Sequence, residues 1–307
     1  MITEGEKNQV YFSQHLVNDY PVIYRQLSEI LTECGIKYST LQRTKDYWCR
    51  DFMPVQYNHE QYVQFKYEPD YLQNSKDIQY QTMPQAVTET LGELHNNIHQ
   101  LSLNIDGGNF VFCKGRDTNY LVMNEKVMEE NKPCERYVIE DLLRAAFECD
   151  TLQIVWMPWD REDKCGHMDS VLRYVGIGDC GKAKVLTCLD VYDDEYASYI
   201  HDILTKHFEV VELKLSDYDL DISWAYINCL QTDKIIIVPG IGNKQTDAEA
   251  MEQIKVLYPQ YEERIYQVQM RNFIKKGGSA LNCCSWTIWR DMSIILKEIE
   301  NQARHTI

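Results

Sequence analysis

Two adjacent thiols near the carboxyl end of the sequence are the first residues that could carry covalent chemistry. Cys283 and Cys284 follow a glycine pair at 277–278, which is itself preceded by two lysines. A thiol attacks only as its thiolate, and a neighbouring imidazole or a cationic substrate lowers its pKa from about 8.5. The alternative interpretation is a pair of structural cysteines at the start of a strand, because free cysteine is often buried.

A histidine and a carboxylate stand two residues apart in the segment Gly-His-Met-Asp. His167 and Asp169 lie on one side of the chain if this segment is extended. Histidine can take the proton of a thiol and later activate water, and a carboxylate can hold a cation beside it. The alternatives are a surface turn or a metal site shared with Cys165. No nearby residue completes a four-ligand set for zinc, so we expect no metal.

Two further aspartates lie in motifs of their own. Asp51 ends Trp-Cys-Arg-Asp and Asp106 begins Asp-Gly-Gly-Asn. Taken alone, the first motif also fits a salt-bridged strand end and the second a hairpin turn, and Trp48 fits either a core position or a platform for a guanidinium plane. Together, however, several carboxylates, one histidine and one thiol are the groups that hydrolysis of a guanidinium requires. This planar cation offers paired N–H donors to carboxylates, and its hydrolysis needs neither metal nor organic cofactor.

Regular elements recur around these motifs. Amphipathic patterns predict helices at 17–34, 86–98, 138–147, 196–208 and 247–257, and strand-like stretches follow them at 36–42, 101–105, 152–157, 209–215 and 264–270. Thr246 and Glu249 have capping-box spacing at the start of the last helix, and Pro259 marks its end. Helix, strand, polar loop and further strand therefore recur about five times, which indicates a repeat architecture.

The loops after these strands carry the reactive residues at similar intervals. Asp51, Asp106, His167, Asn228 and Cys283 are separated by 55, 61, 61 and 55 residues. Asn228 was selected to represent the fourth loop, and without it the step from His167 to Cys283 is 116 residues, about two units. Five similar units would each place one polar loop at a common axis.

Composition narrows the class of protein. The 307 residues are 44% hydrophobic and carry a formal charge of −16, and lysine and arginine are not clustered. We therefore expect no nucleic-acid partner and no anionic membrane partner. The sequence begins without a secretion signal, and its 11 cysteines are odd in number and contain no Cys-x-x-Cys pair, which favours a cytoplasmic protein with reduced thiols. No linker divides it, so we expect one continuous catalytic domain over 1–307.

The motifs, taken in order, resemble those of agmatine deiminases and Porphyromonas-type peptidylarginine deiminases, members of the guanidino-group modifying superfamily. The matching positions cover most of the sequence: Trp48, Arg50, Asp51 and Pro54; Asp106 to Asn109; Gly166, His167 and Asp169; Pro239, Asp247, Ala250 and Pro259; and Gly277, Gly278 and Cys283.

The resemblance implies an α/β fold, a five-bladed pseudo-symmetric propeller of repeated ββαβ units known as the pentein fold. It implies a cytoplasmic deiminase acting on a small guanidinium compound or on peptidyl-arginine, and it leaves a homodimer as one option for assembly. By the same resemblance, Cys283 is the nucleophile, His167 the general acid and base, and Asp106 the residue that orients His167. The implied substrate-binding residues are Asp51, Asp169, Trp48 and, from the peptidylarginine deiminase branch, Asn228.

The sequence also departs from the agmatine deiminase pattern. Asn282 stands where that pattern has histidine before the nucleophile, no Thr-Gln pair follows the cysteine, and no glycine precedes Pro54. These changes affect substrate contacts more than chemistry. Peptidylarginine or arginine hydrolysis, amidino transfer to an amine and guanidinium binding without catalysis therefore stay open beside agmatine hydrolysis.

Overall fold

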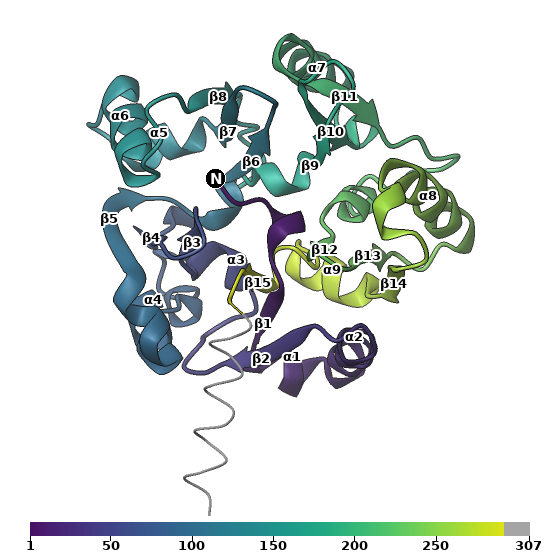
Figure 1. Ribbon diagram of the computed structural model, residues 1–307, viewed down its shortest axis with the longest axis horizontal. Coiled ribbons are helices and arrows are strands. Elements are labelled where there is room, and N and C mark those ends of the chain that lie inside the picture. The colour runs from purple at the N-terminus through teal and green to yellow at the C-terminus, as the bar shows by residue number, and fades with distance from the viewer. Residues whose placement is uncertain (292–307) are drawn as a thin grey trace, which may run out of the picture.

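The computed structural model describes residues 1–291 of the chain, which form five three-stranded sheets around a central axis (Figure 1). In each sheet the middle strand pairs antiparallel with one neighbour and parallel with the other. In sheet order the strands are β15 (Ser285–Ile288), β1 (Gln9–Ser13) and β2 (Lys37–Leu41); β3 (Val55–Gln56), β4 (Tyr62–Lys66) and β5 (Ile98–Asn104); β6 (Phe110–Lys114), β7 (Asn119–Asn124) and β8 (Gln153–Met157); β9 (Leu172–Ile177), β10 (Ala183–Thr187) and β11 (Glu209–Glu212); and β12 (Leu230–Gln231), β13 (Ile236–Gly240) and β14 (Ile265–Gln269). The expected five-bladed α/β propeller is confirmed.

Helices on the outer side of the ring connect each middle strand to its parallel partner (Figure 1). A parallel pair requires such a crossover, whereas an antiparallel pair can be joined by a short turn. The crossovers contain α1 (Gln14–Asp19) and α2 (Pro21–Glu33); α4 (Pro84–Thr88); α5 (Lys126–Glu130) and α6 (Arg136–Ala146); α7 (Asp194–His207); and α8 (Lys244–Leu257).

The α2 helix shows why these segments fold against the sheets. Ile23, Leu27 and Leu31 recur every four residues and are buried, so they form one apolar stripe along the helix. They pack into a core cluster with the middle strands of the first and last sheets. Most predicted helices and strands lie within a few residues of the observed ones. The helix predicted at 17–34 is divided at Tyr20 into α1 and α2, and β11 is shorter than its predicted range of 209–215.

Two local predictions were wrong. The helix expected at 86–98 is α4 followed by a 3-10 segment, Glu89–Asn97, because Gly92 takes a φ of 62° that interrupts any continuous helix. The α8 helix begins earlier than the Thr246 capping box implied. Asn243 caps it by accepting hydrogen bonds from the backbone N–H groups of Gln245 and Thr246, and Thr246 lies inside the first turn.

The first sheet closes the ring, because its edge strand β15, the one nearest the centre in Figure 1, comes from near the other end of the described residues. β1 pairs antiparallel with β15, and Phe12 stands opposite Ser285. Before β1, the short 3-10 segment η1 (Glu4–Glu6) lies close to the centre of the ring in Figure 1. No helix within residues 1–291 is both long and apolar enough to cross a lipid bilayer.

Each sheet also sends its third strand into a loop with a short helix before the next sheet begins. These helices are α3 (Cys49–Phe52), η5 (Gly107–Asn109), η6 (Met168–Ser170), η8 (Ser223–Ile227) and α9 (Arg271–Gly277). The predicted residues Asp51, Asp106, His167, Asp169 and Asn228 lie on or next to the first four of these helices, and Cys283 lies between α9 and β15. The repeat therefore brings residues from distant parts of the chain to one end of the axis.

Candidate active site

The nucleophile expected from sequence lies among polar groups of two other loops. The Cys283 thiol donates to Asp169 Oδ2 at 3.3 Å, and Asn228 Nδ2 donates to the Cys283 sulfur at 3.2 Å. The side-chain oxygen of Asn228 accepts from the backbone N–H groups of Asn282 and Cys283, at 3.0 and 3.3 Å. Asn228 therefore fixes both the sulfur and the backbone that carries it.

The surroundings of Cys283 keep its proton on sulfur. Burial raises the pKa of the thiol to about 11, the charge of Asp169 adds to this effect, and a hydrogen bond with His167 opposes it. The bonds to Asp169 and Asn228 orient the sulfur without ionising it. A cation beside Asp169 would reverse the largest electrostatic contribution, because it would favour the thiolate.

His167 lies between two carboxylates. Its Nε2 is 3.3 Å from Asp106 Oδ2 and 3.9 Å from Asp51 Oδ1. Burial alone would lower the pKa of His167, but the charge of Asp51 and the hydrogen bond with Asp106 raise it well above its ordinary value. The two carboxylates therefore favour the imidazolium form of the ring, which can donate a proton, and they hold it in place.

The site disfavours the charged form of Asp51. Burial raises its pKa, and the charges of Asp106 and Asp169 act in the same direction, while His167 and Arg50 oppose them. Its Oδ1 accepts from the backbone N–H of Gly108 at 3.0 Å. This carboxylate would gain from a bound cation, as expected of a group that holds a guanidinium.

The Asp-Gly-Gly-Asn motif forms the 3-10 helix η5, so the hairpin alternative is wrong. It joins β5 to β6, which belong to different sheets. A Cβ on Gly108 would stand 2.7 Å from the His167 ring and 2.8 Å from Asp51 Oδ1. Only glycine lets this backbone approach both side chains.

Two contacts to the site aspartates were not expected from sequence. The Tyr71 hydroxyl donates to Asp106 Oδ2 at 2.7 Å, and Asn282 Nδ2 donates to Asp169 Oδ2 at 2.6 Å. Asn282 stands where the agmatine deiminase pattern has histidine, and its side chain positions the Asp169 carboxylate. No local pattern marks Tyr71, which lies 35 residues before its partner.

Asp51, Tyr71, His167, Asp169 and Cys283 line a cavity of about 700 Å³. Trp48 lies in the wall of this cavity and packs against Phe273, with ring centroids 5.4 Å apart. A Cβ on Gly277 would come within 2.6 Å of the Trp48 ring, so this position has no room for a side chain. The aromatic residues of the wall are Tyr20, Tyr47, Trp48, Tyr67, Tyr71, Tyr80, Trp224 and Phe273. The cavity thus combines the polar side chains around Cys283 with an aromatic wall, which suits a ligand that has a charged group at the end of an alkyl chain.

Six of the seven predicted residues form two groups. Cys283 lies within hydrogen-bond distance of Asp169 and Asn228, and His167 lies within hydrogen-bond or ion-pair distance of Asp106 and Asp51. Trp48, the seventh, faces the same cavity as Cys283 and His167. Arg50, which precedes Asp51, forms a salt bridge with Glu4. The Trp-Cys-Arg-Asp motif therefore also contains the salt bridge that was one interpretation of its sequence. Within residues 1–291, no group of three or more His, Cys, Asp or Glu side chains is placed to hold a metal ion.

Solved structures share this architecture. The agmatine deiminase of C. jejuni superposes with a TM-score of 0.69 at 16% identity, covering 94% of this chain and 95% of that one. The agmatine deiminase of Enterococcus faecalis gives 0.68 at 17%, covering 94% and 95%. A dimethylarginine dimethylaminohydrolase of Pseudomonas aeruginosa, solved with citrulline, gives 0.56 at 13%, covering 92% and 99%. No curated protein matches the sequence at a significant level.

A five-bladed ring with these relatives defines a protein of the pentein fold. The sequence matches the Porphyromonas-type peptidyl-arginine deiminases over residues 6–288. The chain therefore belongs to the Porphyromonas-type peptidyl-arginine deiminase family, whose members are hydrolases of carbon–nitrogen bonds.

Proposed function

We propose that the protein is a deiminase that hydrolyses the terminal guanidinium of an arginine-like substrate through a covalent intermediate on Cys283. The observation that supports this best is the juxtaposition of the Cys283 thiol, the His167 imidazolium and the carboxylates of Asp51 and Asp169 in one cavity. Because the two ends of the chain share the first sheet, we also propose that the ring acts as a single catalytic domain.

The carboxylates supply the binding step. A guanidinium presents N–H groups along its edges in one plane, and Asp51 and Asp169 each offer acceptor oxygens to such edges. Asp169 Oδ1 is buried and has no hydrogen-bond partner within the described residues. Bound between the two carboxylates, the cation would place its central carbon at the Cys283 sulfur. Trp48 would contact the attached alkyl chain.

The same cation activates the thiol. It neutralises the Asp169 charge, so the pKa of Cys283 falls from its resting value of about 11, and the thiol proton passes to solvent water because His167 already carries its own. The thiolate forms a C–S bond to the guanidinium carbon. His167 gives its proton to the departing nitrogen, the C–N bond breaks, and ammonia leaves an S-alkylthiouronium on the enzyme.

Water completes the cycle. The imidazole of His167, held by Asp106, takes a proton from water, whose oxygen bonds to the thiouronium carbon. The C–S bond then breaks, the electron pair returns to sulfur, and the remaining proton of the added water passes to that sulfur, which restores the resting thiol. The products are a ureido compound and ammonia, so one water is consumed for each nitrogen released.

Release of ammonia and a ureido product from agmatine, arginine and a peptidyl-arginine is the test. Replacing Cys283 by alanine should abolish turnover with every substrate. Cys284→Ala is the matched control, because this neighbouring thiol is also buried but donates to the backbone oxygen of Leu281 instead. Loss of turnover in the Cys284 variant with full activity in the Cys283 variant would reverse the assignment.

The same assay separates hydrolysis from amidino transfer and from simple binding. With an added acceptor amine, a hydrolase still forms only the ureido product, whereas a transferase forms a new guanidine. Binding of arginine analogues without thiol-dependent turnover would identify a non-catalytic protein.

A further inference from the structure

The protein carries a guanidinium of its own beside the catalytic residues, on Arg50. The Arg50 side chain is 11% exposed, and Nη1 donates to Glu4 Oε1 at 2.7 Å while Nε donates to the backbone oxygen of Gly107 at 3.0 Å. Its backbone N–H donates to the backbone oxygen of Cys283 at 3.0 Å. An internal copy of the proposed substrate group thus lies one residue from Asp51.

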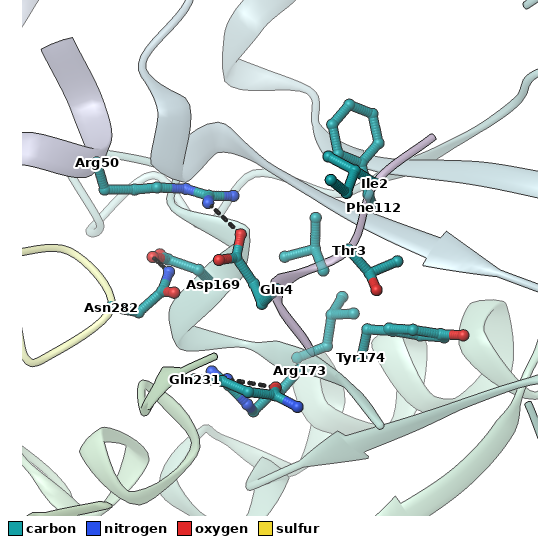
Figure 2. Close-up of a pocket in the computed structure, with 12 residues that line it drawn as sticks. Ile2, Thr3, Glu4, Arg50, Phe112, Asp169, Arg173, Tyr174, Gln231 and Asn282 are labelled. Carbon is teal, nitrogen blue, oxygen red and sulfur yellow. Dashed lines mark hydrogen bonds and ion pairs between the residues drawn. The ribbon is translucent and has the colours of Figure 1, made fainter. Parts of the chain in front are cut away.

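Arg50, Glu4, Asp169 and Asn282 share the lining of a second, small cavity of about 40 Å³ (Figure 2). Figure 2 shows Glu4 meeting the end of the Arg50 side chain, with Asp169 and Asn282 beside them. Asp169 also lines the large cavity that contains Cys283. This carboxylate therefore separates an internal guanidinium from the space where the substrate guanidinium is proposed to bind.

The two carboxylate oxygens of Asp169 differ in their hydrogen-bond partners. Its Oδ2 accepts from Asn282 and from the Cys283 thiol, whereas its buried Oδ1 has no partner within residues 1–291. Guanidinium groups pair with carboxylates wherever geometry permits, so Arg50 is a potential competitor for this atom. Glu4 is the carboxylate that holds Arg50 at present.

We propose that Glu4 is a positioning residue that keeps Arg50 paired away from Asp169, so that Asp169 stays available to the cationic substrate. The inference rests on the proposed guanidinium chemistry at Cys283. It assigns a role in substrate binding to the segment before β1, which none of the sequence motifs included.

The segment is anchored well enough for this role. Glu4 also accepts from Lys7 Nζ at 2.8 Å and from the Thr287 hydroxyl in β15. The backbone N–H of Ile2 donates to the backbone oxygen of Tyr57 at 3.1 Å, and the backbone N–H of Asp233 donates to the backbone oxygen of Lys7 at 2.7 Å. Contacts to three other parts of the ring therefore fix Glu4 across the axis.

The first test is Glu4→Gln, which removes the charge and keeps the shape. The freed Arg50 should pair with Asp169 and raise KM for the guanidinium substrate by roughly tenfold, the scale of one charge-assisted hydrogen bond, with a smaller change in kcat. Glu6→Gln is the matched control from the same 3-10 helix, because Glu6 bonds with Thr3 rather than Arg50. Unchanged KM in a folded Glu4 variant would overturn the proposal.

A second test does not depend on turnover. Alkylation of Cys283 by a cationic haloacetamidine and by the neutral haloacetamide is followed by mass spectrometry. The wild-type protein and Glu6→Gln should prefer the cationic reagent, and Glu4→Gln should lose that preference while its reaction with the neutral reagent is unchanged. Equal slowing with both reagents would indicate a merely structural role and contradict the proposal. A wild-type protein that shows the preference but no turnover would disprove the hydrolase and not the positioning role.

The double variant Glu4→Gln with Arg50→Gln covers the case in which a buried unpaired Arg50 prevents folding. It removes the competing guanidinium together with its partner, so preference for the cationic reagent should return to near the wild-type level. A purely structural loss would not be rescued in this way. A folded double variant without the preference would therefore refute competition by Arg50.

Discussion

At the scale of single residues, the site places a nucleophilic thiol among carboxylates that disfavour its ionisation. Burial and Asp169 raise the pKa of Cys283, and His167 opposes them only in part. The resting thiol is therefore protected from neutral electrophiles at ordinary pH. Under the proposed mechanism, ionisation of the thiol would be coupled to arrival of a cation, which would restrict reactivity to substrates that carry a positive charge.

Alkylation of Cys283 by neutral iodoacetamide should therefore be slow at pH 8 without substrate. Its rate should rise about tenfold for each pH unit up to the resting pKa of about 11, because only the thiolate reacts. Peptide mapping of the modified residue against free cysteine, whose pKa is about 8.5, provides the measurement. A plateau already reached by pH 8 would show that the resting thiol is ionised.

At the scale of elements, the segments that follow the third strands position the site. The short helices α3, η5, η6 and η8 carry or adjoin its carboxylates, histidine and asparagine, and the segment between α9 and β15 carries its thiol. The η5 helix is the most constrained, because Gly107 and Gly108 lie against the backbone of Arg50 and the side chain of His167. These contacts set the separation between the Asp51 and Asp106 loops. The positions of His167 and of the two carboxylates beside it therefore depend on Gly108, which has no side chain.

Gly108→Ala should lower kcat by about a hundredfold or more, because a misplacement of even 1 Å has that effect on positioned groups. The new methyl must displace either the His167 ring or the Asp51 carboxylate. Steady-state kinetics of ammonia release are the readout. Gly115→Ala, in the turn between β6 and β7 where a Cβ meets its nearest atoms at 3.3 Å, should retain activity. Comparable activity of the two variants would show that the tight approach of η5 is unimportant.

Sequence patterns predicted the helices and motifs well where the residues that define them are close together in the sequence. The apolar stripe of α2 and the Asp-Gly-Gly-Asn motif are contiguous, so residue spacing identifies them. The contacts of Tyr71 to Asp106 and of Asn282 to Asp169 span 35 and 113 residues and depend on closure of the ring. The α8 cap was misplaced because Asn243 and Thr246 are both good capping residues, and only the backbone distinguishes them.

At the scale of the whole molecule, the ring gathers several like charges at its axis. Asp51, Asp106 and Asp169 interact electrostatically, and His167 and Arg50 compensate them only in part. The Oδ1 atoms of Asp106 and Asp169 are buried without hydrogen-bond partners in the described chain. Folding the propeller therefore requires burying acceptors that the folded chain does not satisfy by itself.

Asp169→Asn should raise the free energy of unfolding by about 1–2 kcal/mol while abolishing turnover. It removes a buried negative charge that has one unpartnered oxygen, and such a charge is costly to desolvate. Urea unfolding followed by intrinsic fluorescence provides the stability, and ammonia release provides the activity. A destabilised variant would mean that Asp169 contributes to folding rather than opposing it.

The unpartnered oxygen of Asp169 has a consequence for how the fold and its ligand depend on each other. The free site is locally frustrated, and the proposed guanidinium ligand would relieve that frustration by supplying the missing donors. Occupancy should thus be measurable as thermal protection, because a ligand that binds only the folded state raises the melting temperature. A series of guanidinium compounds ranked by that protection would reveal the preferred substrate without any assay of turnover.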